Sequence, residues 1–97
     1  MINSGDLRLV VGLGNPGDRY ASTRHNVGFM VLEQLAAQEH ARFRAMAKLQ
    51  GDLADIGAGP DRLRLLMPKT FMNESGRSIR ATLYWFGLSL GQVIVLV

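Results

Sequence analysis

Residues 93–97 read VIVLV, a run in which every side chain is apolar. A strand that faces solvent on one side alternates apolar with polar residues, whereas a strand covered on both faces is apolar throughout. The run therefore predicts a strand buried on both faces, as in a parallel sheet with helices on either side. Because no polar residue follows it, we expect the sequence to stop in mid-domain.

Two further apolar segments predict strands. LRLVVGL at residues 7–13 is the first, and RLRLLM at residues 62–67, closed by Pro68, is the second. The segment 43–57 is ambiguous, since its residues alternate only in part and fit a strand without requiring one. A turn formed by GAGPD separates it from the strand at 62–67.

Helical spacing of apolar residues predicts two helices. The first runs from about residue 23 to about residue 39, and its apolar face consists of Phe29, Leu32 and Ala36, with Val31 and Leu35 beside them. The second runs from about residue 75 to 86, and its apolar face consists of Ile79, Leu83 and Phe86. Gly87 follows as a C-terminal stop signal.

This order of elements predicts an α/β fold, a three-layer α/β/α-type sandwich around a mostly parallel, partly mixed sheet that is incomplete in this chain. With 97 residues and no linker-like segment, residues 1–97 form a single domain, which we expect to be truncated at its C-terminal end. The sequence contains no cysteine and no secretory or membrane-spanning segment, which favours the cytoplasm. A net charge of +3 modestly favours a polyanionic partner.

The first loop contains the spacing G-x-G-x-x-G, at Gly12, Gly14 and Gly17. A dinucleotide site requires the helix to begin at these glycines and an acidic residue about 20 positions further on. Here Pro16 interrupts the motif and the predicted helix begins later, while the nearest candidates for that acidic residue, Glu33 and Glu39, lie within or at the end of that helix. The pattern therefore argues against a dinucleotide-binding loop.

Two segments place many polar residues beside apolar structure. They are GNPGDRYASTRHNVGF at residues 14–29 and PKTFMNESGRSI at residues 68–79. Each follows a predicted strand and precedes a predicted helix, and in an α/β sheet such strand ends open on one edge, where ligands bind. We therefore expect Asn15, His25 and Asn73 to converge there.

Together these segments resemble the bacterial peptidyl-tRNA hydrolase family, from VVGLGNPG through YASTRHNVGF and KTFMNESG to the last strand. The resemblance implies an enzyme that hydrolyses the ester between a peptide and the 3′ ribose of tRNA and so recycles tRNA from prematurely released peptides. It also implies contacts with the acceptor end and the attached peptide, and a cytoplasmic protein that is monomeric at full length. The family uses no cofactor, metal or membrane.

The resemblance also assigns roles to individual residues. His25 in TRHN matches the catalytic base, and Asn15 in GNPG matches the residue of the catalytic site that helps to distinguish blocked peptidyl-tRNA from free aminoacyl-tRNA. Tyr20, Phe71 and Asn73 match positions that bind the substrate. Two histidines without clustered carboxylates argue against a metal site.

Part of the family pattern lies outside this sequence. The aspartate that pairs with the family's histidine follows the strand that matches VIVLV, and a further substrate-binding asparagine and the basic residues that hold tRNA phosphates lie beyond it. The chain thus resembles the N-terminal half of the enzyme, and we expect this fragment alone to be inactive. Because the family includes relatives recruited to RNA splicing, a non-catalytic RNA-binding protein is the alternative, and the aspartate would distinguish the two.

The chemistry agrees with these roles. Histidine suits the removal of a proton from water, since its unperturbed pKa is about 6.5, and a helix start would disfavour its charged form. The amide of Asn73 could donate to the ester carbonyl oxygen or position the water.

Each of these residues also has a simpler explanation. His25 could cap or pack at a helix start, Asn15 could only shape its turn, and Asn73 and Glu74 could cap the second helix. Phe71 taken alone fits a core position. We expect His40 to be solvated near a helix C-terminus. The basic residues that we assign to solvated surface, without assigning any of them a contact to tRNA, are Arg24, Arg42, Arg44, Lys48 and Lys69.

Overall fold

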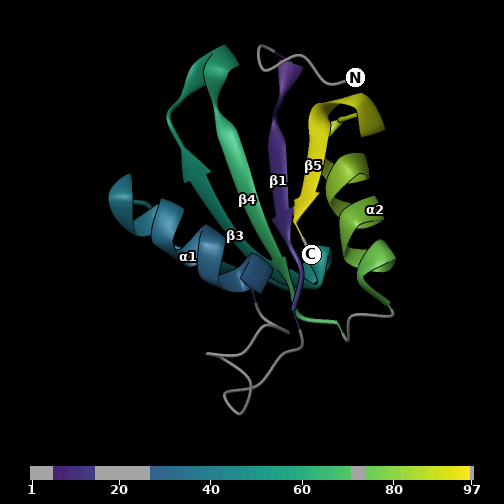
Figure 1. Cartoon of the computed structure of the whole chain (residues 1–97). Helices are drawn as coiled ribbons and strands as arrows, with labels where there is room; N and C mark the ends of the chain where they lie inside the picture. The colour runs from purple at the N-terminus through teal and green to yellow at the C-terminus, as the bar shows by residue number, and fades with distance from the viewer. Residues whose placement is uncertain (1–5, 15–26, 71–73, 97) are drawn as a thin grey trace.

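Five strands form one mixed sheet in the order β2-β3-β4-β1-β5 in the computed structural model, which describes residues 6–14, 27–70 and 74–96 (Figure 1). The elements along the chain are β1 (Leu9–Gly12), α1 (Val27–Gln38), β2 (Arg44–Met46), β3 (Gly51–Ile56), β4 (Leu63–Pro68), α2 (Ser75–Phe86) and β5 (Val93–Leu96). Short 3-10 turns lie between some of these elements, at Ala47–Leu49 (η4), Gly59–Asp61 (η5) and Leu90–Gln92 (η7).

The central strand β1 is parallel to both of its neighbours, β4 and β5, whereas β3 is antiparallel to β2 and β4. Four strands therefore run in one direction and β3 in the other, which confirms the mostly parallel, partly mixed sheet. The ambiguous segment 43–57 holds two antiparallel strands, β2 and β3. They are joined through η4 and Gln50, which adopts a left-handed conformation with φ of 55°.

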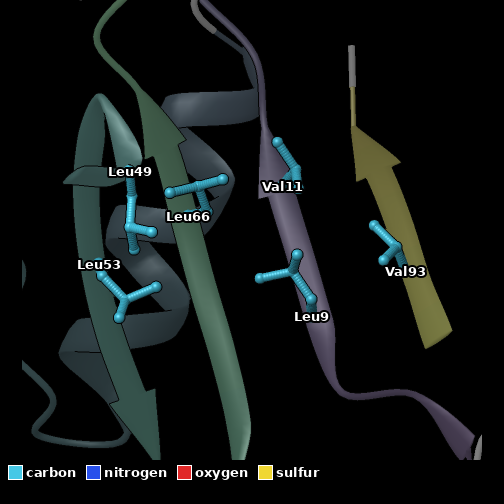
Figure 2. Packing of buried hydrophobic residues seen from close by; sticks show 6 residues of the cluster. All are labelled: Leu9, Val11, Leu49, Leu53, Leu66 and Val93. Atoms are coloured by element: carbon cyan, nitrogen blue, oxygen red, sulfur yellow. The ribbon is translucent and has the colours of Figure 1, made fainter. Parts of the chain in front are cut away.

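The two helices cover opposite faces of the sheet. On one face the side chains of Leu9, Val11, Leu49, Leu53, Leu66 and Val93 form a buried cluster. Figure 2 shows these six side chains on the face of the sheet away from α1. Residues of α2 pack against this cluster, whereas Leu32 and Ala36 of α1 belong to a second cluster, with Val10 and Leu65 of the sheet. The predicted three-layer arrangement is confirmed.

Helix α2 has the predicted bounds and the predicted apolar face. Ile79, Leu83 and Phe86 pack against the first cluster. Gly87 ends the helix with φ of 66°, and its N–H donates to the carbonyl oxygens of Leu83 and Tyr84. The side chains of α2 that are most deeply buried are instead small and polar, namely Ser75, Ser78 and Thr82. Hydrophobic periodicity gave no sign of these three positions.

Helix α1 buries Leu32 and Ala36, with Phe29 and Leu35 partly covered, as the spacing predicts. Val31 is exposed. The predicted start near residue 23 lies outside the described residues. His40 follows the helix and is exposed, which confirms its assignment to the surface.

The last strand differs from its prediction. Of its described residues Val93 is buried, but Ile94 is 37% exposed and Val95 is 43% exposed. The physical reason is that β5 is an edge strand here, paired with β1 alone among the described residues. Within the described ranges, no helix has both the length and the apolar character needed to cross a membrane.

Candidate active site

The carboxyl ends of three strands meet at one edge of the sheet (Figure 1). Gly12 at the end of β1 is level with Leu96 at the end of β5, and Val11 is level with Leu66, two residues before the end of β4. The N–H of Leu13 donates to the carbonyl oxygen of Leu96 at 2.9 Å, which extends the pairing past β1. This is the edge at which α/β sheets bind ligands.

Two glycines fix the amino end of α1 on this edge. A Cβ atom on Gly12 would lie 2.4 Å from the carbonyl oxygen of Gly28. A Cβ atom on Gly28 would lie 2.5 Å from the nitrogen of Leu13 and 2.7 Å from the carbonyl oxygen of Leu96. Only glycine allows backbones to approach so closely. The helix start, the end of β1 and the end of β5 therefore form one packed unit.

This contact explains Gly12, the first glycine of the motif, without a nucleotide. Gly12 is buried and serves the packing of strand against helix, and Gly28 belongs to the second motif, TRHNVGF. Gly14 and Val27, the described residues on either side of segment 15–26, thus both lie beside the end of β1.

The five residues that sequence analysis assigns to the site all lie outside the described residues. Asn15, Tyr20 and His25 belong to segment 15–26, and Phe71 and Asn73 belong to segment 71–73. The structure does place the residues on either side of these segments. Gly14 and Val27 flank the first segment, and Thr70 and Glu74 flank the second. Both pairs lie where strands end and helices begin. The convergence of Asn15, His25 and Asn73 stays a prediction, because only the residues that flank them are described.

The start of α2 tests whether Glu74 is present in the motif only to cap the helix. Glu74 occupies the N-cap position but makes no capping hydrogen bond with its side chain. Its carboxylate instead lies 3.9 Å from Arg77, and both side chains are largely exposed. Capping by Glu74 therefore does not explain this part of the motif, and capping by Asn73 concerns a residue outside the described ranges.

Two hydroxyl groups next to segment 71–73 were not singled out by sequence analysis. Thr70 Oγ1 and Ser75 Oγ are buried and have no hydrogen-bond partner among the described residues. Buried hydroxyls normally have partners, because an unsatisfied one costs about 1–3 kcal/mol. The available signal was the spacing of Ser75 with Ser78 and Thr82, which places small polar side chains on one stripe of the helix.

Acidic side chains of β3 pair with basic side chains at both ends of the sheet, Asp52 at this edge and Asp55 at the opposite one. Lys69 follows β4 and its Nζ lies 3.0 Å from Asp52. Asp55 lies between two arginines, 3.3 Å from Arg44 and 3.7 Å from Arg64. Burial lowers the pKa of the Arg64 guanidinium, which lies 3.8 Å from the centroid of the Phe86 ring, while Asp55 opposes that shift.

The assignment of basic residues to the surface holds where it can be checked. The side chains of Arg42, Arg44, Lys48 and Lys69 are all exposed. Arg24 lies outside the described residues. Among residues 6–14, 27–70 and 74–96, no group of three histidine, aspartate or glutamate side chains could hold a metal ion.

A three-layer α/β sandwich with motif-bearing segments at the ends of its parallel strands is typical of an enzyme that binds its substrate at that edge. The profile of the peptidyl-tRNA hydrolase family matches residues 9–97. The chain belongs to the peptidyl-tRNA hydrolase family.

Individual relatives support this membership. The peptidyl-tRNA hydrolase of Synechococcus sp. strain CC9311 is 72% identical over 96 residues, and that of Prochlorococcus marinus strain MIT 9303 is 58% identical over 93 residues. These matches cover 99% and 96% of this chain but only 46% and 45% of the two relatives. The crystal structure of peptidyl-tRNA hydrolase from Acinetobacter baumannii superposes with a TM-score of 0.87 at 34% identity, and it covers 98% of this chain and 48% of that one. The chain thus spans about half the length of its relatives.

Proposed function

We propose that these residues form the N-terminal half of a peptidyl-tRNA hydrolase, which hydrolyses the ester between a peptide and the 3′ ribose oxygen of tRNA. The observation that carries the proposal is the family match over residues 9–97, which includes every motif assigned to the site. The geometry of the described residues supports it. Asn15 and Asn73 are bonded directly to Gly14 and Glu74, and His25 is two residues from Val27, so chain connectivity limits each Cα to within about 7 Å of a described residue at this edge.

The proposed reaction assigns the proton transfers to His25. Its neutral imidazole accepts a proton from water, and the water oxygen attacks the ester carbonyl carbon. The bond from that carbon to the 3′ ribose oxygen then breaks, and the ribose oxygen takes the proton from the imidazolium. The products are a peptide with a free carboxylic acid group, which releases its proton to solvent, and a tRNA with a free 3′ hydroxyl. Asn73 either donates to the carbonyl oxygen, which is worth roughly 3 kcal/mol in a preorganised site, or positions the water.

The other assigned residues bind the substrate in this proposal. Tyr20 and Phe71 provide aromatic surface for the peptide or the terminal nucleotide. Asn15 hydrogen-bonds to the blocked amino end of the substrate. No cofactor or metal takes part.

We further propose that residues 1–97 are part of one domain whose remaining half lies against β5. The support is the exposure of Ile94 and Val95 on an edge strand, in a family whose members are about twice as long. In such a protein the added chain would cover these side chains and supply the aspartate that orients His25. The proposed whole protein is a cytoplasmic monomer.

The test of the catalytic assignment is His25→Ala in the whole protein. We expect the rate of hydrolysis of N-acyl-aminoacyl-tRNA to fall by at least about 10³-fold, because no other base is assigned to the site. Circular dichroism and urea unfolding check that the fold is intact. Turnover close to the wild-type rate would rule out His25 as the base. A wild-type protein that binds tRNA but hydrolyses nothing would point instead to the RNA-binding alternative.

The selectivity assigned to Asn15 has a separate test. Asn15→Ala and Asn15→Asp should reduce the ratio of hydrolysis rates between N-acylated and free aminoacyl-tRNA, because a hydrogen bond to the blocked amino end is lost or opposed. Both rates are measured on the same tRNA, so that differences in tRNA binding cancel. A ratio equal to that of the wild type, with an intact fold, would return Asn15 to the role of shaping its turn.

A further inference from the structure

An open groove runs along the exposed side of α2. Its volume is about 420 Å³, and the residues that line it are Gln50, Arg77, Arg80, Ala81 and Tyr84. The first of these follows η4, the turn that packs against α2, and the other four belong to the helix. None of these residues carries a role in the proposed hydrolysis.

The helix brings two arginines and one aromatic ring onto the same stripe. Arg77, Arg80 and Tyr84 are three and four residues apart, so their side chains are neighbours on the helix surface. Tyr84 is 88% exposed, and its ring is therefore free to stack on a ligand. The adjacent ring of Trp85 is half-exposed, and Lys48 Nζ lies 4.4 Å from its centroid.

The groove carries a positive charge that acidic residues do not neutralise. Residues 75–97 contain no aspartate or glutamate. The nearest acidic residue along the helix, Glu74, lies 3.9 Å from Arg77 in an exposed pair, which is worth little in water. Arg80 makes no ion pair with any residue in the described parts of the chain. An anionic ligand would meet two guanidinium groups here.

Guanidinium groups beside an exposed aromatic ring suit a nucleotide strand. Arginine binds phosphate oxygens through two parallel hydrogen bonds, and tyrosine stacks on a base of any identity. We propose that this face of α2 binds single-stranded RNA, with the phosphates on Arg77 and Arg80 and a base stacked on Tyr84. The proposal rests on the proposed function, since it assigns the groove to the RNA part of the same substrate.

The position of α2 connects this groove to the candidate active site. The helix begins with Ser75 at the sheet edge where the strands end. With a rise of about 1.5 Å per residue, Arg77 lies about 3 Å and Tyr84 about 14 Å further along the helix axis. An RNA strand whose end lies at that edge can therefore follow α2 over about 14 Å.

The test uses a labelled single-stranded RNA oligonucleotide and the whole protein, with fluorescence anisotropy measured over a series of salt concentrations. Arg80→Gln should weaken binding and reduce the slope of log K against log salt by about 0.7, the value for one lost phosphate contact on a single strand. Arg42→Gln is the matched control, because it removes the same charge from an exposed site outside the groove and should leave the slope unchanged.

The stacking role has its own pair of variants. Tyr84→Leu keeps apolar surface but removes the ring and should weaken RNA binding about tenfold, whereas Tyr84→Phe should bind like the wild type. In hydrolysis of N-acyl-aminoacyl-tRNA, Arg80→Gln and Tyr84→Leu should raise KM and leave kcat unchanged.

Two results would overturn the proposal. RNA affinity unchanged in both Arg80→Gln and Tyr84→Leu would show that the groove does not bind the strand. An acidic peptide that binds as tightly as the RNA, with the same loss in Arg80→Gln, would show a site for a protein segment instead. A different result would contradict the proposed function alone. In that case the variants lose RNA affinity as expected, but the wild-type protein hydrolyses no N-acyl-aminoacyl-tRNA.

Discussion

Gly12 and Gly28 show how single residues position the candidate site. At both positions an added Cβ would meet backbone atoms of the opposite element rather than the end of a flexible side chain. The backbone on each side must therefore move to accept a methyl group, and the start of α1 would move away from the ends of β1 and β5. The first two motifs are joined through this contact, so a disturbance here reaches the segment that carries His25.

We predict that Gly28→Ala lowers the free energy of unfolding by about 2–3 kcal/mol, the upper part of the range for overpacking. Urea unfolding of the whole protein measures it. Gly76→Ala is the matched control, because a Cβ at Gly76 would have no atom within 4 Å. Replacing this helical glycine by alanine should raise the free energy of unfolding by about 0.5–1 kcal/mol. Equal free energies of unfolding for the two variants would contradict the close approach of α1 and β1 at Gly28.

At the same scale, sequence analysis could propose site residues but could not predict the backbone contact beside them. His25 and Asn15 stand out by their chemical type and by the motifs around them. The contact of Gly12 with Gly28 gives no such signal, because glycine takes no part in hydrophobic periodicity and the two positions are 16 residues apart. Close approach of two backbones is a property of the assembled fold.

Among the elements, α2 depends on a hydrogen bond that its apolar pattern does not reveal. Ser78 Oγ donates to the carbonyl oxygen of Leu49 at 2.6 Å, and both residues are buried. This bond connects the helix to η4, the turn between β2 and β3. Thr82 Oγ1 donates only to the carbonyl oxygen of Ser78, within the same helix.

We predict that Ser78→Ala lowers the free energy of unfolding by about 1–3 kcal/mol, since it leaves a buried carbonyl without this donor. Thr82→Val is the control. It keeps the side-chain volume and removes only the hydrogen bond to the Ser78 carbonyl oxygen within the helix, so it should lower the free energy of unfolding by less. Chemical denaturation of both variants provides the comparison. A Thr82→Val loss as large as that of Ser78→Ala would mean that the bond to Leu49 does not dock the helix.

The elements also show where prediction from sequence ends. The bounds of α2 were predictable because Ile79 and Gly87 mark its apolar face and its stop. The segment 43–57 was not resolved into β2 and β3, because β2 has only three residues and none is fully buried. A strand this short and exposed forms because it pairs with β3, and its own hydrophobic pattern does not specify it.

At the scale of the whole molecule, the exposed side of β5 is the feature with the largest consequence. Ile94 and Val95 point to opposite faces of an edge strand, and both are exposed although every residue of VIVLV is apolar. Neither face of the sheet is thus fully covered at this strand. An edge strand with exposed apolar side chains also favours association with other chains.

We predict that residues 1–97 alone hydrolyse N-acyl-aminoacyl-tRNA at least about 10³-fold more slowly than a protein of the length of its relatives that contains them. The reason is that loss of the residue that orients a catalytic histidine costs about 10⁴-fold in serine proteases, and the proposed aspartate lies beyond these residues. The fragment should also form oligomers, which light scattering measures alongside the rate. Ile94→Lys is the matched variant that separates the two effects, because a charge on the exposed strand should reduce association without restoring hydrolysis. A monomeric fragment with a rate within tenfold of the longer protein would show that the site is complete without the second half, and that β5 is a natural edge of the sheet.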